Sequence, residues 1–346
     1  VLDKCLKEDI KNPSLWTDLC WRAQQICHHL SEPFSLYIFR AFSRGDWYDH
    51  YFFLTFLGKM QQRLLTYRLR DCAYVVEAMC NPKFRENRFV FVCLSLYFLS
   101  MGREDTKRGS NSMKCNVKKK RFLQNIFEHA QALLTHRSDI STEDICYFLG
   151  ALRFLEDPPV SLVIKMGESL RQRDLRCIKF SYRVEALEAF ASIDFSGSKE
   201  ILDTLVQTLK NEYKEASLSE IIRMVHAFSQ LQIKDRPFFR DLRERVLPLR
   251  YKLKPQEIAP ALYGFAKGDV LSPLLSQELE IGVCEFVDKF SPVDLCLSVS
   301  GFLMGPPADK VLGILIPRLR LQLKYVPPSS LVLLFDGLTR TKFQVK

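Results

Sequence analysis

Four consecutive cations, Lys118 to Arg121, are the densest set of side chains in this sequence that could hold a ligand. They end a stretch, residues 102–121, with eight basic and two acidic side chains, a net charge of +6 out of +10 for the whole chain. Adjacent cations suit phosphate oxygens, and counterion release makes such binding salt-dependent. We therefore expect phosphate contacts here; an acidic protein surface suits the same charges, and a solvated loop is the alternative. The candidates are Lys107, Arg108, Lys114, Lys118, Lys119, Lys120 and Arg121.

Two later segments that we expect to be helical carry further basic residues. One runs from Arg236 to Arg250, where acids at Asp241 and Glu244 partly offset the charge. The other lies between residues 318 and 324. Five of these side chains join the candidates for nucleic-acid binding: Arg240, Arg243, Arg318, Arg320 and Lys324.

Two cysteines and two histidines near the start of the chain could in principle ligate a metal: Cys20, Cys27, His28 and His29. Their spacing matches no standard zinc signature. Cys20 and Cys27 also fall at helical intervals from Trp16, which favours packing in a helical core. We therefore expect no metal and no other cofactor.

Catalytic motifs do not occur in the sequence. The other histidines have no recurring acid or nucleophile beside them: His50, His129, His136 and His226. There is no Walker loop, G-x-G-x-x-G, G-x-S-x-G or H-E-x-x-H motif. We expect neither an enzymatic activity nor a small-molecule substrate.

A repeated pair, one small residue followed by a bulky apolar one, indicates which elements carry these candidates. The small residues are Ala41, Ala78, Ala151, Ala189, Ala227, Gly264, Gly301 and Gly337. Successive steps are 37, 73, 38, 38, 37, 37 and 36 residues, and the longest step corresponds to two periods. A constant period of this size is typical of stacked supersecondary units, so we predict an all-α solenoid of tandem helical hairpins with a period of about 37 residues.

The residues around each small position support a helix. In all eight copies, the residue five places before the small residue and the residue two places before it are of types that can be buried. Together with the bulky residue that follows the small one, they fall on one side of a helix. The residue immediately before it varies, from Arg40 to Asp336, and we expect it to face solvent, with Tyr263 as an exposed aromatic. Reading one RNA base per repeat is the alternative, disfavoured by acids at three of these places.

Helix starts recur in the same register. Ser141, Ser217 and Ser291 each stand three residues before an acid, the capping-box arrangement. Pro255, Pro292 and Pro328 suit first helical positions. Second amphipathic stretches follow at residues 237–250, 274–290 and 310–325, so each unit is a helical hairpin.

This pattern divides the chain into four parts. We predict an N-terminal helical cap at 1–31, first repeats at 32–101, a basic flexible insertion at 102–120, and continuing repeats at 121–346 in one continuous solenoid. The longest apolar run, Phe89 to Met101, has 13 residues, whereas a membrane span needs about 20. We therefore predict a buried helix there and no membrane span. Eleven cysteines without a C-x-x-C pair fit reduced thiols in a non-secretory compartment.

Three segments carry a family resemblance: SLSEIIRMVHAFSQL, KPQEIAPALYGFAKG and SPVDLCLSVSGFLMG. They resemble the first helix of heptatricopeptide or octotricopeptide repeats, which occur in organellar proteins that often end in a RAP domain and in FAST-kinase-like proteins. The likeness covers most of residues 32–343 and is weaker before 139. It implies right-handed stacks of paired helices that work on mitochondrial or plastid RNA, and some members are fixed parts of mitochondrial ribosomes. No RAP domain is recognisable, so its nuclease-like activity is not carried over.

We therefore expect a non-catalytic, RNA-associated structural component of a mitochondrial ribonucleoprotein, above all the mitochondrial ribosome, that binds rRNA phosphates and neighbouring proteins. The resemblance implies the mitochondrial matrix; because the chain starts at Val1, we expect a processed or trimmed product without any transit peptide. One alternative is a free organellar factor for RNA maturation or stability. Another is a protein-only scaffold subunit of a respiratory or ATP synthase assembly.

Overall fold

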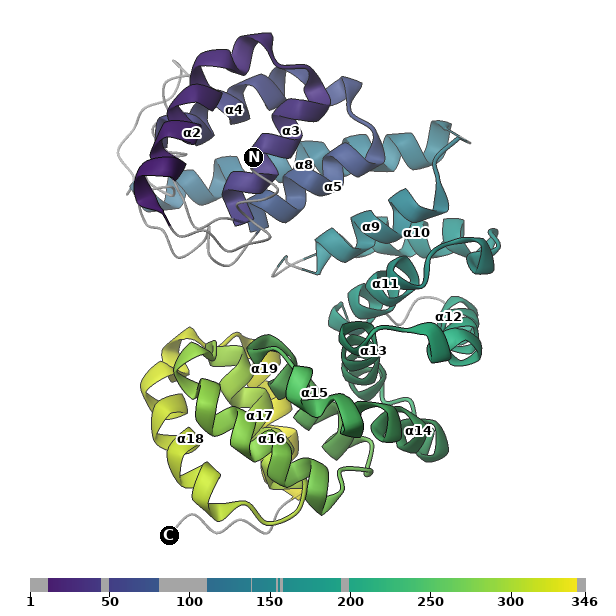
Figure 1. The fold of residues 1–346 in the computed structure, drawn as a ribbon. Helices are drawn as coiled ribbons and strands as arrows, with labels where there is room; N and C mark the ends of the chain where they lie inside the picture. Colours follow the sequence, from purple (N-terminus) through teal and green to yellow (C-terminus); the bar gives the residue numbers. More distant parts are fainter. Residues whose placement is uncertain are drawn as a thin grey trace. The chain divides into compact units, whose positions relative to one another are not determined.

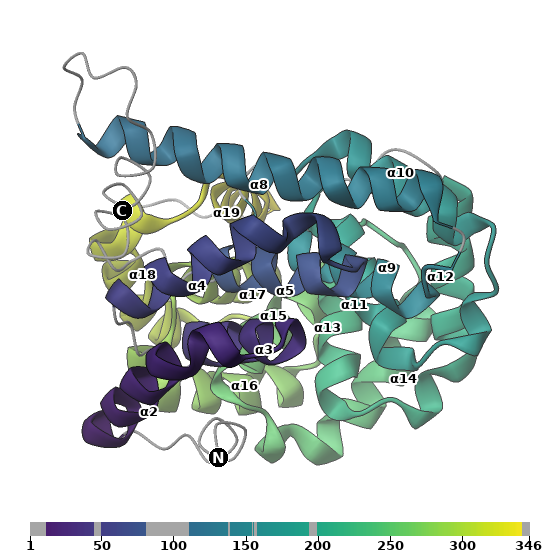
Figure 2. The same ribbon diagram turned by 90° about the horizontal axis from the view of Figure 1, so that it is seen from above.

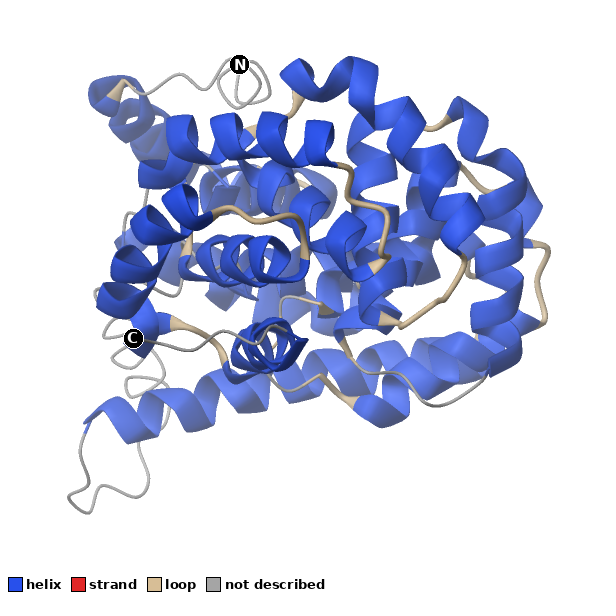
Figure 3. Ribbon diagram, turned by 90° about the horizontal axis from the view of Figure 1, so that it is seen from below, coloured by secondary structure: helices blue, strands red, loops and turns tan. Residues whose placement is uncertain are grey.

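The computed structural model describes residues 12–44, 50–80, 111–137, 139–153, 155, 158–193 and 199–340. Every regular element in these ranges is a helix, and no strand occurs among them (Figure 3). Two compact units divide the chain, unit 1 at residues 1–178 and unit 2 at residues 179–346. That both belong to one continuous stack stays a prediction.

Unit 1 contains the N-terminal helices (Figure 1). They are α2 (Pro13–Ile26), α3 (Glu32–Arg44), α4 (His50–Arg63), α5 (Leu69–Cys80), α8 (Asn111–His136), α9 (Thr142–Leu152) and α10 (Val160–Arg171). Helix α5 packs between α3 and α9, while α4 contacts α2 and α3, and α10 contacts α8 and α9. As predicted for a helical core, Trp16, Cys20 and Cys27 are buried.

Unit 2 is built from alternating helices. They are α11 (Phe180–Ser192), α12 (Lys199–Glu212), α13 (Leu218–Gln230), α14 (Arg236–Val246), α15 (Pro255–Lys267), α16 (Pro273–Phe286), α17 (Pro292–Met304), α18 (Asp309–Gln322) and α19 (Pro328–Arg340). The odd-numbered helices, which we call first helices, contact one another in order, and each even-numbered second helix up to α18 contacts the first helix before it. The apolar core therefore lies between successive helical pairs.

Local sequence signals explain where the first helices begin. The Ser217 hydroxyl accepts from the Glu220 amide, and the Glu220 carboxylate accepts in return from the Ser217 amide; Ser291 and Asp294 form the same capping box. Ser141 caps α9 through the amide of Asp144. Pro255, Pro292 and Pro328 are the first residues of their helices, where a missing amide proton costs no hydrogen bond. These predicted starts are confirmed.

Glycines let the backbones of consecutive first helices approach closely. A Cβ atom placed on Gly301 would lie 2.7 Å from Leu262 Cγ and 3.0 Å from the backbone nitrogen of Tyr263. One placed on Gly264 would lie 2.6 Å from Val225 Cγ1. Because a Cβ atom does not fit at such distances, α15 and α17 require glycine at this position, whereas α13 has Ala227 there.

The apolar residues five and two places before each small residue are buried in every first helix of the described chain except α19. On α19, Val332 is 65% exposed and Phe335 is 61% exposed. These positions pack against the following first helix elsewhere in the chain, and no described helix follows α19. The repeat pattern predicted that both residues would be buried, and for α19, the last described helix, this prediction is wrong.

The basic insertion predicted at 102–120 differs in part from the structure. Residues 102–110 lie outside the described residues, but 111–120 are helical backbone and form the start of the 26-residue helix α8 (Figure 2). The prediction of a flexible segment is therefore wrong for residues 111–120, the second half of the predicted insertion. The continuous turns of α8 leave no room for a loop before Arg121. Only the backbone is described for residues 111–121.

The predicted buried helix at Phe89 to Met101 lies outside the described residues. Among the helices of the described ranges, none has both the length and the apolar character needed to cross a bilayer.

The glycine contact predicts that replacing Gly301 and replacing Gly313 will change the free energy of unfolding in opposite directions. Gly301→Leu should lower the free energy of unfolding by about 1–3 kcal/mol, because the new side chain overlaps Leu262 and the α15 backbone. Gly313→Leu is the matched control, since Gly313 lies on the exposed side of α18, where a Cβ atom would have no neighbouring atom within 4 Å. It should stabilise by about 0.5–1 kcal/mol through helix propensity. Urea unfolding of both variants checks this, and equal effects would contradict the helix contact.

Candidate functional site

Two turns from first to second helices in unit 2, those after α13 and α15, share one geometry. Gln232 (φ 55°) and Asp269 (φ 56°) are left-handed residues just after α13 and α15, 37 residues apart. In each turn an amide one residue later donates back into the helix: Ile233 N to Phe228 O at 3.0 Å and Val270 N to Phe265 O at 3.1 Å. These hydrogen bonds satisfy carbonyl groups in the last turn of each helix, and they fix the position of the residues that follow the turn.

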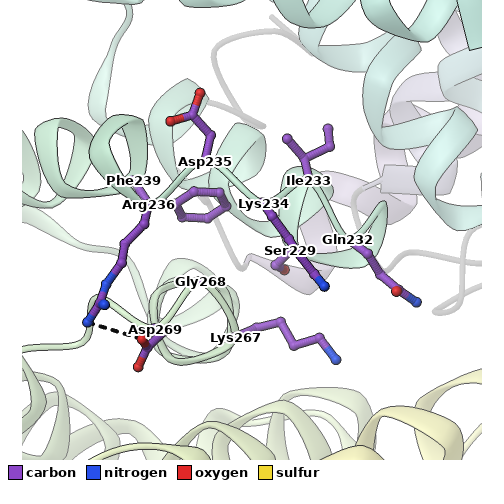
Figure 4. Close-up of a pocket in the computed structure, with 10 residues that line it drawn as sticks. All are labelled: Ser229, Gln232, Ile233, Lys234, Asp235, Arg236, Phe239, Lys267, Gly268 and Asp269. Carbon is purple, nitrogen blue, oxygen red and sulfur yellow. Dashed lines mark ion pairs between the residues drawn. The ribbon is translucent and has the colours of Figure 1, made fainter.

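Two adjoining cavities lie along these turns, each of about 410 Å³. The first lies between the α13–α14 turn and the end of α15, with Lys234, Phe239 and Lys267 in its lining (Figure 4). The second lies between α14 and the turns after α15 and α17, with Arg240 and Arg243 in its lining. Arg236 and Asp269 line both cavities. We call this side of unit 2 the basic turn edge.

Cations outnumber carboxylates in the lining of the two cavities. The five cations are Lys234, Arg236, Arg240, Arg243 and Lys267, and the two carboxylates are Asp235 and Asp269. Asp235 is already neutralised by Lys210, whose Nζ lies 2.5 Å from Oδ2, and it also caps α14 by accepting from the Phe238 amide at 3.1 Å. The hydrogen bond from Lys210 holds the pKa of Asp235 below its ordinary value. In Figure 4, Asp235 points away from Lys267.

The cations differ in how firmly they are already paired. Lys267 binds Asp336 of α19, and Arg243 binds Glu244 and donates to Val270 O at 3.1 Å. Lys234 and Arg240 are exposed and form no ion pair with any residue that the structure describes. Arg236 and Asp269 pair at 3.1 Å, but they are 58% and 82% exposed (Figure 4). An exposed pair of this kind contributes little, so Arg236 remains available to another anion.

This arrangement can bind anions. Guanidinium and ammonium groups are suited to phosphate or carboxylate oxygens. Among the described residues, no group of three or more histidine, cysteine, aspartate or glutamate side chains is placed to hold a metal. The chemistry that the basic turn edge supports is electrostatic binding of a polyanion.

The structure brings together only some of the residues predicted from the sequence. Arg240 and Arg243 share the second cavity, whereas Arg318 pairs with Asp288, and Arg320 and Lys324 are exposed elsewhere on unit 2. The remaining candidates belong to unit 1. Lys107 and Arg108 lie outside the described residues, and the backbone of α8 carries the others: Lys114, Lys118, Lys119, Lys120 and Arg121.

Sequence analysis missed Lys234 and Lys267 as site residues. They lie about 33 residues apart and meet only because neighbouring hairpins stack. Their position within the repeat is the signal that could have identified them. Both stand at the turns between first and second helices, where the repeat places neighbouring side chains at the same edge.

The variable position before each small residue does not face solvent as expected. It pairs with the next first helix: Arg40 Nε lies 2.9 Å from Glu77 Oε2, and Glu188 binds Arg223 at 2.5 Å. Tyr263, predicted to be an exposed aromatic, is 1% exposed, with its ring edge toward His226 at 6.0 Å between centroids. Close packing of first helices covers this position, so the expectation was wrong.

His226 on α13 has a perturbed pKa and lies between neighbouring first helices. Its Nε2 atom is buried and has no hydrogen-bond partner among the described residues. Burial lowers its pKa from 6.5 to about 4, against the opposing effect of Glu188. The folded protein therefore holds this imidazole neutral.

This burial predicts a pH dependence of stability. Between pH 6.5 and about 4 the unfolded chain takes up a proton on His226 that the folded chain resists, so stability falls with falling pH by at most about 1.4 kcal/mol per pH unit. His226→Met should remove this part of the slope. His136→Met, at an exposed position at the end of α8, should keep the wild-type slope. Thermal melts across this range check it, and an unchanged slope in His226→Met would contradict the burial of a neutral imidazole.

A scan against protein-family models gave no match, and a search of curated proteins gave no similar sequence. The class that the structure itself defines is an all-helical protein of stacked helical pairs with a basic edge. The resemblance to organellar helical repeats stays a prediction.

Proposed function

We propose that this protein is a non-catalytic α-solenoid that binds RNA phosphates within a mitochondrial ribonucleoprotein, above all the mitochondrial ribosome. The observation that carries the proposal is the basic turn edge, where two adjoining cavities gather five cations and two carboxylates, one of them already neutralised by Lys210. A polyanion with regularly spaced charges fits such an edge better than a single small anion does.

The solenoid part of the proposal is supported by the spacing of the first helices. From α9 onward they begin at residues 142, 180, 218, 255, 292 and 328, at intervals of 38, 38, 37, 37 and 36. Nearly equal intervals within unit 2 place equivalent side chains at similar steps along one axis. The turns that carry Lys234 and Asp269 are related in this way, so the two cavities are successive copies of one position.

The mode of binding that we propose is contact with the backbone of RNA. Lys234 and Arg240 are unpaired cations among the described residues, and Arg236 can exchange its exposed partner for a phosphate. Such contacts fix the position of RNA and carry little information about its sequence. This suits a structural subunit, which must hold one RNA in place inside an assembly.

The mitochondrial part of the proposal has separate support. It comes from the resemblance of the three helix segments to organellar repeats, and from cysteines that are buried and free, such as Cys72 and Cys296. Buried free thiols suit a reducing compartment. RNA bound to the protein purified from the mitochondrial matrix is the expected result of a mild purification.

Lys234→Gln combined with Arg240→Gln tests the basic turn edge, because both side chains are exposed and form no ion pair with any described residue. Each lost contact with a phosphate of single-stranded RNA should reduce the slope of log affinity against log salt by about 0.7, so the pair should reduce it by about 1.4. The measurement is RNA binding by fluorescence anisotropy across a salt series. Arg22→Gln combined with Arg137→Gln removes the same charge from exposed sites in unit 1 and should leave the slope unchanged.

Equal effects of the two pairs would mean that net charge alone attracts RNA, and would contradict a site. No measurable RNA affinity in the wild-type chain would favour the protein-only scaffold. Strong preference for one RNA sequence over unrelated tracts would favour the free maturation factor.

The cluster on α8 is tested in the same assay. Replacing Lys118, Lys119, Lys120 and Arg121 with glutamine should flatten the salt dependence further if these residues contact phosphates. Thermal stability should stay almost unchanged. A slope equal to that of the wild type would remove this cluster from the phosphate contacts and leave the basic turn edge alone.

A further inference from the structure

The opposite end of each helical pair in unit 2 repeats a second feature. Every second helix from α12 to α18 ends in a short 3₁₀ turn that leads into the next first helix: η4 (Tyr213–Glu215), η5 (Leu247–Lys252), η6 (Val287–Lys289) and η7 (Leu323–Tyr325). At each turn a cation lies over an aromatic ring. The pairs, with distances to the ring centroid, are Arg245 over Tyr213 (5.7 Å), Lys252 over Tyr251 (5.7 Å), Lys289 over Phe286 (5.0 Å) and Lys324 over Tyr325 (4.8 Å). We call this side the aromatic edge.

The positions on the aromatic edge follow the repeat. Tyr213, Tyr251 and Tyr325 are 38 and 74 residues apart, which is one step and then two. The exposed lysines Lys214 and Lys252 are also 38 residues apart. Packed helices lie about 8–10 Å apart, so rings two repeats apart along this edge stand roughly 20 Å from each other.

The rings at two of these turns are mostly exposed. Tyr251 is 74% exposed and Tyr325 is 65% exposed, whereas Tyr213 packs edge-on against Phe238 at 5.1 Å between centroids. Neither exposed ring belongs to the apolar core between the helices. Each carries a lysine beside it whose charge is exposed.

The charge of the aromatic edge is positive. Its exposed cations are Lys214, Lys252, Lys254, Lys289 and Lys324. Exposed carboxylates on the same turns and helix ends are Glu215, Glu244, Glu285 and Asp288; Glu244 is held by Arg243 and Asp288 by Arg318. An exposed ring beside an unneutralised cation, repeated along one edge, can bind a base and its phosphate at the same time.

We propose that the aromatic edge binds a single-stranded stretch of RNA, with bases stacked on Tyr251 and Tyr325 and phosphates on the neighbouring lysines. The proposal rests on the proposed function, because it takes RNA as the ligand. A single strand is required, since a duplex hides the faces of its bases from a side chain. An acidic protein segment would use the lysines but has no planar group for the rings.

This surface is distinct from the basic turn edge. The helices of unit 2 have 11 to 14 residues, so their two ends are about 16–21 Å apart at 1.5 Å per residue. Substitutions on one edge therefore leave the side chains of the other untouched. The two surfaces also differ in ligand, since phosphate contacts alone accept duplex and single strand alike.

The test compares Tyr251→Ala combined with Tyr325→Ala against the matched pair Tyr251→Phe with Tyr325→Phe, which keeps both rings. The probes are a labelled oligouridine of about 16 nucleotides and an RNA duplex of the same length. The alanine pair should weaken oligouridine binding about fivefold for each ring and leave duplex binding unchanged, and the phenylalanine pair should bind both as the wild type does. Both rings are mostly exposed, so thermal melts should match the wild type.

Each of the other possible outcomes would contradict at least one part of the proposal. Unchanged oligouridine binding in the alanine pair, together with weaker binding in the Lys234→Gln and Arg240→Gln pair, would overturn the aromatic edge and leave the proposed function standing. Equal losses for oligouridine and duplex would show that the rings do not stack on bases. Binding of polyglutamate, but not of oligouridine, that is lost in Lys252→Gln with Lys324→Gln would assign the edge to an acidic protein. No binding of either RNA would overturn both proposals.

Discussion

The backbone contact between consecutive first helices determines the arrangement of everything else in unit 2. It forms where the glycine of one helix meets the helix before it, as Gly301 meets Leu262 and the Tyr263 amide. No side chain fits in that space, so the point where α17 crosses α15 is fixed. The second helices are held only by their own first helix and their neighbours, and they follow the same steps.

Two surfaces with different chemistry follow from this one constraint. Because the crossings repeat, the turns at one end place Lys234, Arg236 and Arg240 beside equivalent turns of the next pair and form the cavities of the basic turn edge. The turns at the other end place Tyr251 and Tyr325 with their lysines along the aromatic edge. Polar residues of the first helices, such as Glu188 and Arg223, pair with each other between neighbouring helices.

Features decided by neighbouring residues could be predicted from the sequence, and features decided by distant contacts could not. Ser217 and Pro292 mark helix starts through bonds within one turn, so the elements were found. The burial of Tyr263 depends on the helices that flank it, and the meeting of Lys234 with Lys267 depends on stacking, so both were missed. The division between residues 178 and 179, and the helical start of α8 in a polar basic stretch, have no local signal of this kind.

Amide hydrogen exchange of the native chain tests the central contact most directly. Buried helices that open only with the whole unit exchange slowest, whereas helices on a surface open locally. If first helices are packed backbone to backbone, the slowest amides should lie in α13, α15 and α17, and those of α14, α16 and α18 should exchange faster. Equal or slower exchange in the second helices would contradict the claim that the first helices form the core of the stack.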